Sequence, residues 1–149
     1  MNARFTHLDN EGNARMVDVG EKPIQRRKAV AIGKLFCQPS TIEAIKQKTV
    51  KKGDVLAVAR VAAIQASKKT SELIPLCHNI NLDNVEVEFE LGTNSVAVRC
   101  SASATAKTGV EMEALTGVAV AALTLYDMCK SIDKTMNIGE ITLIEKTKK

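Results

Sequence analysis

Asp127 and Lys130 are the two residues whose spacing most directly suggests chemistry. They lie three positions apart near the end of a long apolar segment, 111–134, that is predicted to form a helix. Residues three apart share a helix face, so this carboxylate and this ammonium can form an ion pair or act together as base and acid. Glu113 falls near the same line of the helix, toward its other end. The spacing alone favours the structural ion pair and leaves the catalytic alternative open.

The segment 73–78, "LIPLCH", carries one of the two histidines of the chain. Pro75 disfavours helix at the residue before it, so the segment should leave the preceding helix as an extended connection that presents His78. A lone histidine is more often a hydrogen-bonded structural residue than a catalyst, and only His7, in the N-terminal arm, could join it in a metal site. Neighbours in an extended chain point to opposite sides, which argues against a thiolate–imidazole pair of Cys77 and His78.

The basic residues occur in short groups rather than in one block, and the net charge is +4. Lys52 precedes Gly53 at a predicted turn and Lys68 lies near the end of the following helix, positions that are typical of solvated lysines. The chain has neither a G-x-x-x-x-G-K-[ST] nor a G-x-G-x-x-G motif, so phosphate binding would depend on side-chain cations. This distribution suits a small anionic ligand better than a nucleic acid, because aromatic residues are not interleaved with the basic ones.

Periodicity and capping signals predict the elements that must position these residues. Ser40 and Glu43 form a capping box, Gly53 should end that helix and Asp54 should cap the next. In the long helix, an apolar stripe that includes Tyr126 is expected to face the core. The predicted elements are a strand at 24–36, a helix from 40, a helix at 55–73, strands at 85–91 and 95–104, the helix at 111–134 and a strand at 138–145. This order predicts an α+β fold: a ferredoxin-like split βαβ sandwich with an antiparallel sheet, helices on one face and one extra helix.

Composition sets the class of protein. A chain of 149 residues with 45% hydrophobic and 26% charged residues should form a single domain, preceded by a polar, extended arm at residues 1–22. The four cysteines form no C-x-x-C pair, which predicts free thiols and no zinc ribbon. No apolar segment has the length of a membrane span and the first residues do not resemble a signal peptide, so a soluble cytoplasmic protein is expected. The sheet face opposite the helices should need a partner.

Four strings in the same order carry a more specific resemblance. They are "MVDVG" (16–20), "KGDVLAVARVAAI" (52–64), "LIPLCH" (73–78) and "KTGVEMEALTGVAVAALTLYDMCK" (107–130). From about Thr6 to Lys146 the chain resembles the cyclic pyranopterin monophosphate synthases of molybdenum cofactor biosynthesis. The resemblance implies a lyase that converts (8S)-3′,8-cyclo-7,8-dihydroguanosine 5′-triphosphate to cyclic pyranopterin monophosphate and releases pyrophosphate. It also implies a homohexamer, a trimer of dimers with active sites at the dimer interface, and no redox cofactor; Mg²⁺ with the triphosphate is left open.

Carried over by position, the resemblance implies three catalytic residues and a set of substrate contacts. The catalytic residues are Lys52, Asp127 and Lys130. The substrate-binding residues are Arg27, Lys68, Leu76, Cys77, His78, Glu111, Met112, Glu113 and Lys146. Lysines gathered near other cations should have lowered pKa values and so be able to transfer protons at neutral pH. The sequence departs from the family pattern at 79–81, "NIN", where a proline is usual, and in a shorter tail after Lys146.

Two functions of other classes compete with the lyase. A non-catalytic nucleotide-binding assembly would use the same cations, but it would not need a carboxylate such as Asp127 beside them. An RNA-binding ferredoxin-like domain is disfavoured by the exposed glutamates of the strand "VEVEFE", which would repel phosphates. We therefore expect neither a nucleic-acid partner nor a membrane partner.

Overall fold

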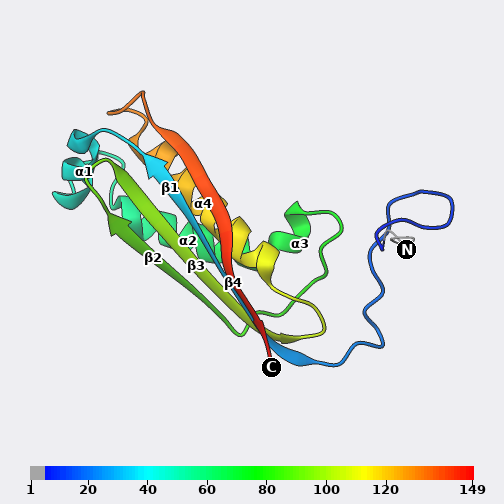
Figure 1. Cartoon of the computed structure of the whole chain (residues 1–149). Helices are drawn as coiled ribbons and strands as arrows, with labels where there is room; N and C mark the ends of the chain where they lie inside the picture. The colour runs from blue at the N-terminus through cyan, green and yellow to red at the C-terminus, as the bar shows by residue number, and fades with distance from the viewer. Residues whose placement is uncertain (1–5) are drawn as a thin grey trace.

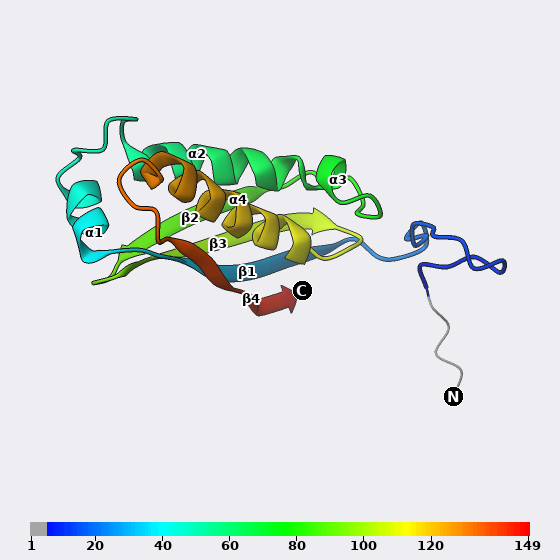
Figure 2. The same cartoon turned by 90° about the horizontal axis from the view of Figure 1, so that it is seen from above.

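Four antiparallel strands form one sheet in the order β2-β3-β1-β4 in the computed structural model, which describes residues 6–149 (Figure 1). The elements are β1 (Gln25–Phe36), α1 (Pro39–Lys46), α2 (Val55–Lys68), α3 (Thr70–Leu73), β2 (Asn84–Leu91), β3 (Ser95–Ala106), α4 (Glu111–Cys129) and β4 (Asn137–Lys148). The helices cover one face of the sheet (Figure 2). Because β3 lies between β1 and β2, the crossover is a split βαβ unit, and the predicted ferredoxin-like α+β fold is confirmed.

Alternation along β2 and β3 separates a buried face of the sheet from an open one. In β3, Val96, Val98 and Cys100 are buried under the helices, while Arg99 points to the other face. The open face carries exposed ion pairs, Lys34 with Glu140 at 2.9 Å and Arg99 with Glu88 at 3.6 Å. They border a groove of about 530 Å³ whose apolar lining includes Ile32, Ala97 and Ile144. No element within residues 6–149 covers this face.

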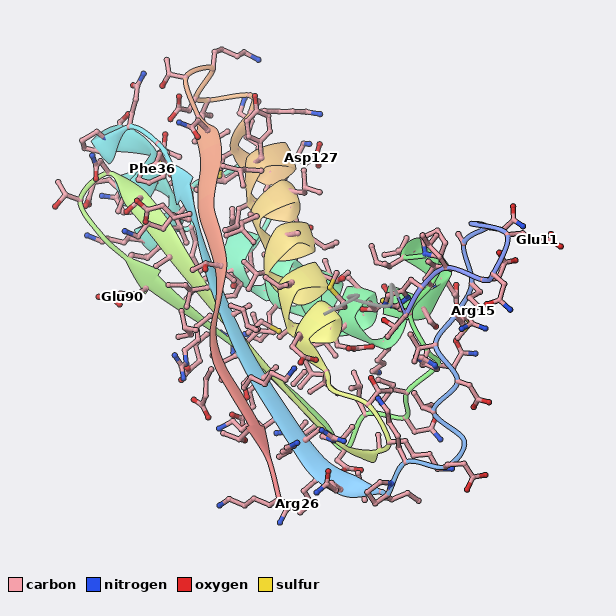
Figure 3. All side chains as sticks on the ribbon, turned by 45° about the vertical axis from the view of Figure 1, so that its right-hand side comes forward. Glu11, Arg15, Arg26, Phe36, Glu90 and Asp127 are labelled. Carbon is pink, nitrogen blue, oxygen red and sulfur yellow. The ribbon has the colours of Figure 1, made fainter. Side chains whose placement is uncertain are left out.

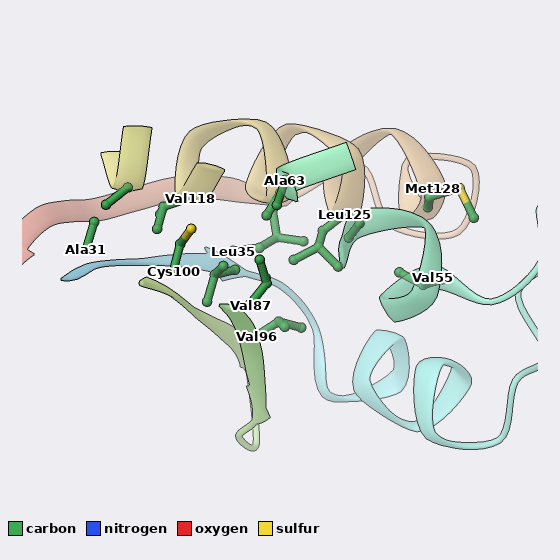
Figure 4. Packing of buried hydrophobic residues seen from close by; sticks show 14 of the residues in the cluster. Ala31, Leu35, Val55, Ala63, Val87, Val96, Cys100, Val118, Leu125 and Met128 are labelled. Carbon is green, nitrogen blue, oxygen red and sulfur yellow. The ribbon is translucent and has the colours of Figure 1, made fainter. Parts of the chain in front are cut away.

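Helix α4 fills the centre of the core, where it packs against α2 and against β1, β3 and β4 (Figure 4). Its predicted stripe is partly wrong: Ala122 and Cys129 are buried as expected, but Tyr126 is 37% exposed and Leu125 is buried instead. The reason is that α4 packs against the sheet and also against the neighbouring helix α2, so its buried face is wider than one stripe. A single line of apolar residues therefore did not identify the correct centre of that face.

By length and composition, α4 is the one helix within residues 6–149 that could cross a membrane. Half of the stretch that meets this test is buried inside the domain. Its contacts with the sheet and with α2 account for the apolar composition.

Two glycines let α4 approach its neighbours closely. A Cβ atom on Gly117 would lie 2.6 Å from both the Cys100 sulfur and the Ser67 hydroxyl oxygen. On β1, a Cβ atom on Gly33 would lie 2.6 Å from Cγ1 of Val118. Both positions exclude larger side chains, so the helix sits at a fixed depth and rotation on the sheet.

Several helix boundaries differ from those predicted. The capping box was wrong: α1 begins at Pro39 and no side chain caps it from its Ncap position. Helix α1 also ends at Lys46, well before Gly53. Asp54 does cap α2, because its Oδ1 accepts from the Ala57 amide at 3.0 Å. The segment 55–73 is two helices rather than one, and α4 ends at Cys129, five residues earlier than expected.

A distant carboxylate takes the place of the missing cap. Asp133, 2% exposed, accepts hydrogen bonds from the Gln38 amide at 2.8 Å and the Thr41 hydroxyl at 2.9 Å. Its other oxygen accepts from the amide and hydroxyl of Thr135, at 2.8 and 2.7 Å. Burial opposes ionisation of Asp133, but these four hydrogen bonds outweigh it and lower the pKa to about 2. Asp133 thus ties the start of α1 to the loop that follows α4.

The segment before β1 extends away from the sheet (Figure 1). Residues 6–15 form a small loop closed by a bridge between Leu8 and Ala14. The Asp9 carboxylate holds this loop by accepting from the amides of Glu11 and Asn13, at 2.9 and 2.8 Å. All four cysteines are free, as predicted, and two of them are buried.

Candidate active site

The three predicted catalytic residues meet at the C-terminal end of α4. Asp127 lies in its last turn, and its two carboxylate oxygens accept from Lys130 at 2.7 Å and from Lys52 at 3.0 Å. Lys52 also donates to the Asp127 carbonyl at 2.8 Å, one of the carbonyls that the end of a helix leaves free. Lys52 comes from the turn before α2, so a contact over 75 positions completes the group. We call Lys52, Asp127 and Lys130 the lysine–aspartate cluster.

The charges in this cluster stabilise one another. Hydrogen bonds from Lys130 and then Lys52 lower the pKa of Asp127. The hydrogen bond to Asp127 raises the pKa of Lys130. The expected lowering of the lysine pKa values is therefore wrong for Lys130 in the single chain. The nearest charged group to Lys130 is the carboxylate of Asp127, not another cation. All three side chains remain between 40% and 55% exposed, so a ligand can reach them.

A second group of predicted site residues gathers at the N-terminal end of α4. Glu111, in the first turn, forms an ion pair with Lys146 of β4. Pairing between β1 and β4 places Lys146 opposite Ala29, two residues from Arg27. Arg27 donates to the Lys107 carbonyl at 3.3 Å. Burial raises the pKa of Glu111, but the hydrogen bond and charge of Lys146, with a smaller contribution from the charge of Arg27, help to lower it overall. Two cations and a carboxylate thus converge where the sheet meets the start of α4.

Glu113 is the most unusual side chain of this group. It is 3% exposed, and its Oε2 has no hydrogen-bond partner within residues 6–149. Burial, and to a lesser degree the charge of Glu111, raises the pKa of Glu113. A buried carboxyl oxygen without a partner is costly and is retained where a ligand can satisfy it. Glu113 is thus suited to hydrogen bond a polar ligand group, as donor when protonated and as acceptor when ionised.

The loop after α3 lies next to this end of α4. Ile74 is extended, as Pro75 requires, but the chain then turns, with the Cys77 amide donating to the Ile74 carbonyl at 3.1 Å. The predicted extended connection is therefore a turn. Burial and then the charge of Glu113 raise the pKa of Cys77, which keeps it a thiol. His78 Nε2 lies 2.6 Å from the Val17 carbonyl oxygen.

We call this whole group the glutamate–histidine cluster. Its members are Arg27, Leu76, Cys77, His78, Glu111, Met112, Glu113 and Lys146. Lys68 does not join either cluster directly; it ends α2 and lines a groove of about 470 Å³ together with residues 80–85. Lys52 lies in the turn before α2 and Lys68 ends this helix, whose 14 residues span about 21 Å, so the expected gathering of these two lysines does not occur within one chain.

The two clusters lie at opposite ends of α4. Glu113 and Asp127 are 14 residues apart, about 21 Å along the helix axis. Figure 3 shows Asp127 at one end of the domain and Arg26, next to Arg27, at the other. The structure thus brings together the residues within each cluster, but not the two clusters.

Sequence reasoning did not identify Lys107 or Val17 as hydrogen-bonding neighbours of the predicted site residues. Lys107 donates to the Gly20 carbonyl, and Val17 contacts His78 through its backbone. Both lie inside strings that carry the resemblance, which was the only available signal. Val17 contacts His78 through a backbone carbonyl, a group that every residue has. No rule of composition or spacing could therefore have selected Val17.

Comparison with known proteins settles the family. The model of the MoaC family matches residues 16–149. The chain belongs to the MoaC family. A cyclic pyranopterin monophosphate synthase of Clostridium botulinum is 56% identical over 149 residues, covering 99% of this chain and 94% of the relative. That of Natranaerobius thermophilus is 52% identical, covering 96% and 91%.

A third relative of the MoaC family is longer. The molybdenum cofactor biosynthesis bifunctional protein of Chlorobaculum tepidum is 53% identical over 143 residues, and this chain spans only 46% of its length. The match to the family model begins at residue 16, so it includes Val17 and Gly20 together with both clusters.

Proposed function

We propose that this chain is a cyclic pyranopterin monophosphate synthase acting in molybdenum cofactor biosynthesis. The lyase converts (8S)-3′,8-cyclo-7,8-dihydroguanosine 5′-triphosphate to cyclic pyranopterin monophosphate with release of pyrophosphate. The observation that carries this proposal is the near full-length identity of more than half to proteins of that name. The lysine–aspartate cluster supports it, because a binding protein has no need for a carboxylate between two exposed cations.

The two clusters supply complementary chemistry. Rearrangement of the purine-derived ring moves protons on and off carbon, nitrogen and oxygen, and Lys52 and Lys130 are the acid and base candidates for these transfers. Asp127 holds both ammonium groups in place until substrate arrives. Glu113, whose pKa burial raises, can hydrogen bond the guanine-derived edge.

In this proposal, side-chain cations bind the phosphate groups of the substrate. A substrate hydroxyl oxygen gives up its proton to a base and attacks the α-phosphorus to form the cyclic phosphate. The bond from the α-phosphorus to the α–β bridging oxygen breaks, and pyrophosphate leaves with that oxygen. Arg27, Lys146 and Lys68 can neutralise the charge of the triphosphate and of this leaving group. Within residues 6–149, no group of three or more His, Cys, Asp and Glu side chains could hold a metal ion. Any Mg²⁺ that accompanies the triphosphate would arrive with the substrate.

We propose further that each active site is shared between two subunits of a homohexamer, a trimer of dimers. The separation of about 21 Å between the clusters supports this arrangement, because one small substrate cannot contact both within a single chain. The uncovered sheet face, with its apolar groove and paired charges, offers a surface for a neighbouring subunit. Four free thiols are in keeping with a cytoplasmic enzyme.

Hybrid assemblies test the shared site. Lys52→Ala and Glu113→Gln chains, co-expressed with different affinity tags, should each be inactive alone but should recover about a quarter of wild-type turnover when mixed equally. When the chains pair at random, half of the dimers contain one chain of each variant. In such a dimer one active site carries both substitutions and the other carries neither, so a quarter of all sites are intact. Light scattering should give a mass about six times the 16.1 kDa of one chain.

The control mixes Lys52→Ala with Lys130→Ala, which damage the same cluster. This pair should recover nothing, because both sites of a mixed dimer then carry one substitution. Absence of recovery in the first mixture as well as in the control, or a stable monomer with full activity, would show that one chain holds the whole site.

Phosphate recognition gives a separate prediction. Lys68→Ala should raise KM for the triphosphate by about ten- to a hundredfold and lower kcat much less, because a cation that binds an unreacting phosphate holds ground state and transition state alike. Arg27→Ala should act in the same direction. The measurement is steady-state kinetics at two salt concentrations, with exposed Lys69→Ala as control. An unchanged KM for Lys68→Ala would exclude Lys68 from phosphate binding.

The reaction itself is the decisive test of the proposed function. Purified protein is incubated with the cyclic dihydroguanosine triphosphate, and both the pyranopterin and pyrophosphate are measured. Appearance of both products in equal amounts would establish the lyase. Tight binding without turnover would instead favour the non-catalytic nucleotide-binding assembly.

A further inference from the structure

A short segment before β1 touches two loops of the glutamate–histidine cluster. We call residues 17–20 the strap. Its Val17 carbonyl oxygen lies 2.6 Å from His78 Nε2, and its Gly20 carbonyl accepts from Lys107 Nζ. Between these points the Asp18 carboxylate accepts from the Gly20 amide at 2.7 Å, which fixes a turn. The strap is therefore a formed structure with a contact at each end.

The contact at Val17 determines which nitrogen of His78 carries a proton. A carbonyl oxygen can only accept a hydrogen bond, so Nε2 must be the donor. When the ring is neutral, Nδ1 is then the unprotonated nitrogen. Within the described residues, 6–149, no protein group hydrogen bonds to Nδ1. The ring thus has one nitrogen committed to the strap and one available to a ligand.

The contact at Gly20 connects the strap to the other half of the cluster. Lys107 lies in the loop between β3 and α4, and its own carbonyl accepts from Arg27 at 3.3 Å. Helix α4 begins four residues after Lys107, and its first turn carries Glu111 and Glu113. The strap therefore spans from the loop that carries His78 to the loop that leads into α4.

We propose that the strap is a positioning element that holds His78 as the Nε2–H tautomer, with Nδ1 as its hydrogen-bond acceptor toward the substrate. This rests on the proposed function and on the substrate contact that the resemblance implies for His78. The substrate must then present an N–H or O–H group to Nδ1, as a ring nitrogen or a ribose hydroxyl does. Lys107 acts through the strap rather than on the substrate.

The test observes the ring directly. The His7→Gln full-length protein has a single histidine, which can be labelled with ¹³C and ¹⁵N and studied by solid-state NMR of the sedimented protein at pH 8. We expect the spectrum of a neutral ring protonated at Nε2 and free at Nδ1. Lys107→Ala, made in the same background, should move the two nitrogen shifts toward each other as the ring loses its fixed partner.

Kinetics complete the test. Losing a positioning hydrogen bond should lower kcat of Lys107→Ala about three- to tenfold. Lys22→Ala removes a neighbouring lysine whose side chain makes no hydrogen bond or ion pair within residues 6–149, so neither its spectrum nor its kcat should change. A ring protonated at Nδ1, or a Lys107→Ala protein with wild-type spectrum and kcat, would overturn the proposal. If neither the wild type nor any variant turns over substrate, the proposed function fails. The NMR spectrum still shows whether the strap holds His78 as the Nε2–H tautomer.

Discussion

Replacing Lys52 or Lys130 by alanine, or Asp127 by asparagine, should lower turnover by about 10²- to 10⁴-fold while the melting temperature stays close to that of the wild type. The loss is large because general acid and base groups act in the transition state itself. The melting temperature should hardly change because all three side chains are half exposed, and exposed ion pairs contribute little to stability.

The comparison distinguishes the two interpretations of the Asp127–Lys130 spacing. A purely structural pair would lose stability and activity together, in proportion. Lys48→Ala is the matched control, since Lys48 forms a similarly exposed ion pair with Asp54 at 3.1 Å outside both clusters. That variant should keep both its turnover and its melting temperature. Variants of Lys52 and Lys130 that retain wild-type turnover would remove the catalytic assignment.

The second large effect concerns stability. Asp133→Asn should lower the free energy of unfolding at pH 7 by about 2–3 kcal/mol, because an amide offers one acceptor oxygen to four donors that two carboxylate oxygens now satisfy. Urea denaturation at fixed protein concentration measures this loss. Asp83→Asn is the control, since exposed Asp83 accepts a single side-chain hydrogen bond within residues 6–149, from the Thr105 hydroxyl at 2.8 Å, and should lose much less stability.

The same site predicts how acid acts on stability. The pKa of Asp133 is about 2 in the folded protein and 3.8 ordinarily, so its ionised form stabilises the fold above about pH 4. This contribution, on the order of 2 kcal/mol, should be lost as pH falls from about 4 to 2. The difference between wild type and Asp133→Asn should therefore shrink over that range. A difference that is constant with pH would mean that the charge of Asp133 is not what stabilises α1.

The sequence predicted β2 and β3 well because their residues alternate regularly between the two faces of the sheet. Val85, Val87 and Phe89 alternate with glutamates, and β2 starts within one residue of the predicted position. Helix ends were predicted less well, because the signals used were local. Ser40 and Glu43 looked like a cap, yet the groups at the start of α1 are satisfied by Asp133, more than 90 residues away. Long-range capping leaves no periodic trace in a sequence.

The site was predicted from resemblance more than from spacing. Spacing identified the Asp127–Lys130 pair, which the structure contains, but gave no reason to add Lys52 from another element. The buried, unpartnered state of Glu113 could not be predicted either, since it depends on how α4 meets the sheet and the loop of Cys77. The roles of all these residues remain predictions for the experiments above.

The close packing of α4 on its neighbours limits where chains of this family can tolerate insertions and deletions. Inserting one residue between Glu113 and Asp127 would turn one end of the helix by about 100° relative to the other and lengthen it by about 1.5 Å. Gly117 and the contact of Gly33 with Val118 prevent the helix from sliding or rotating to absorb that change. Insertions and deletions should therefore accumulate in the loops at either end of α4 and be absent from the helix, even at positions that touch no substrate.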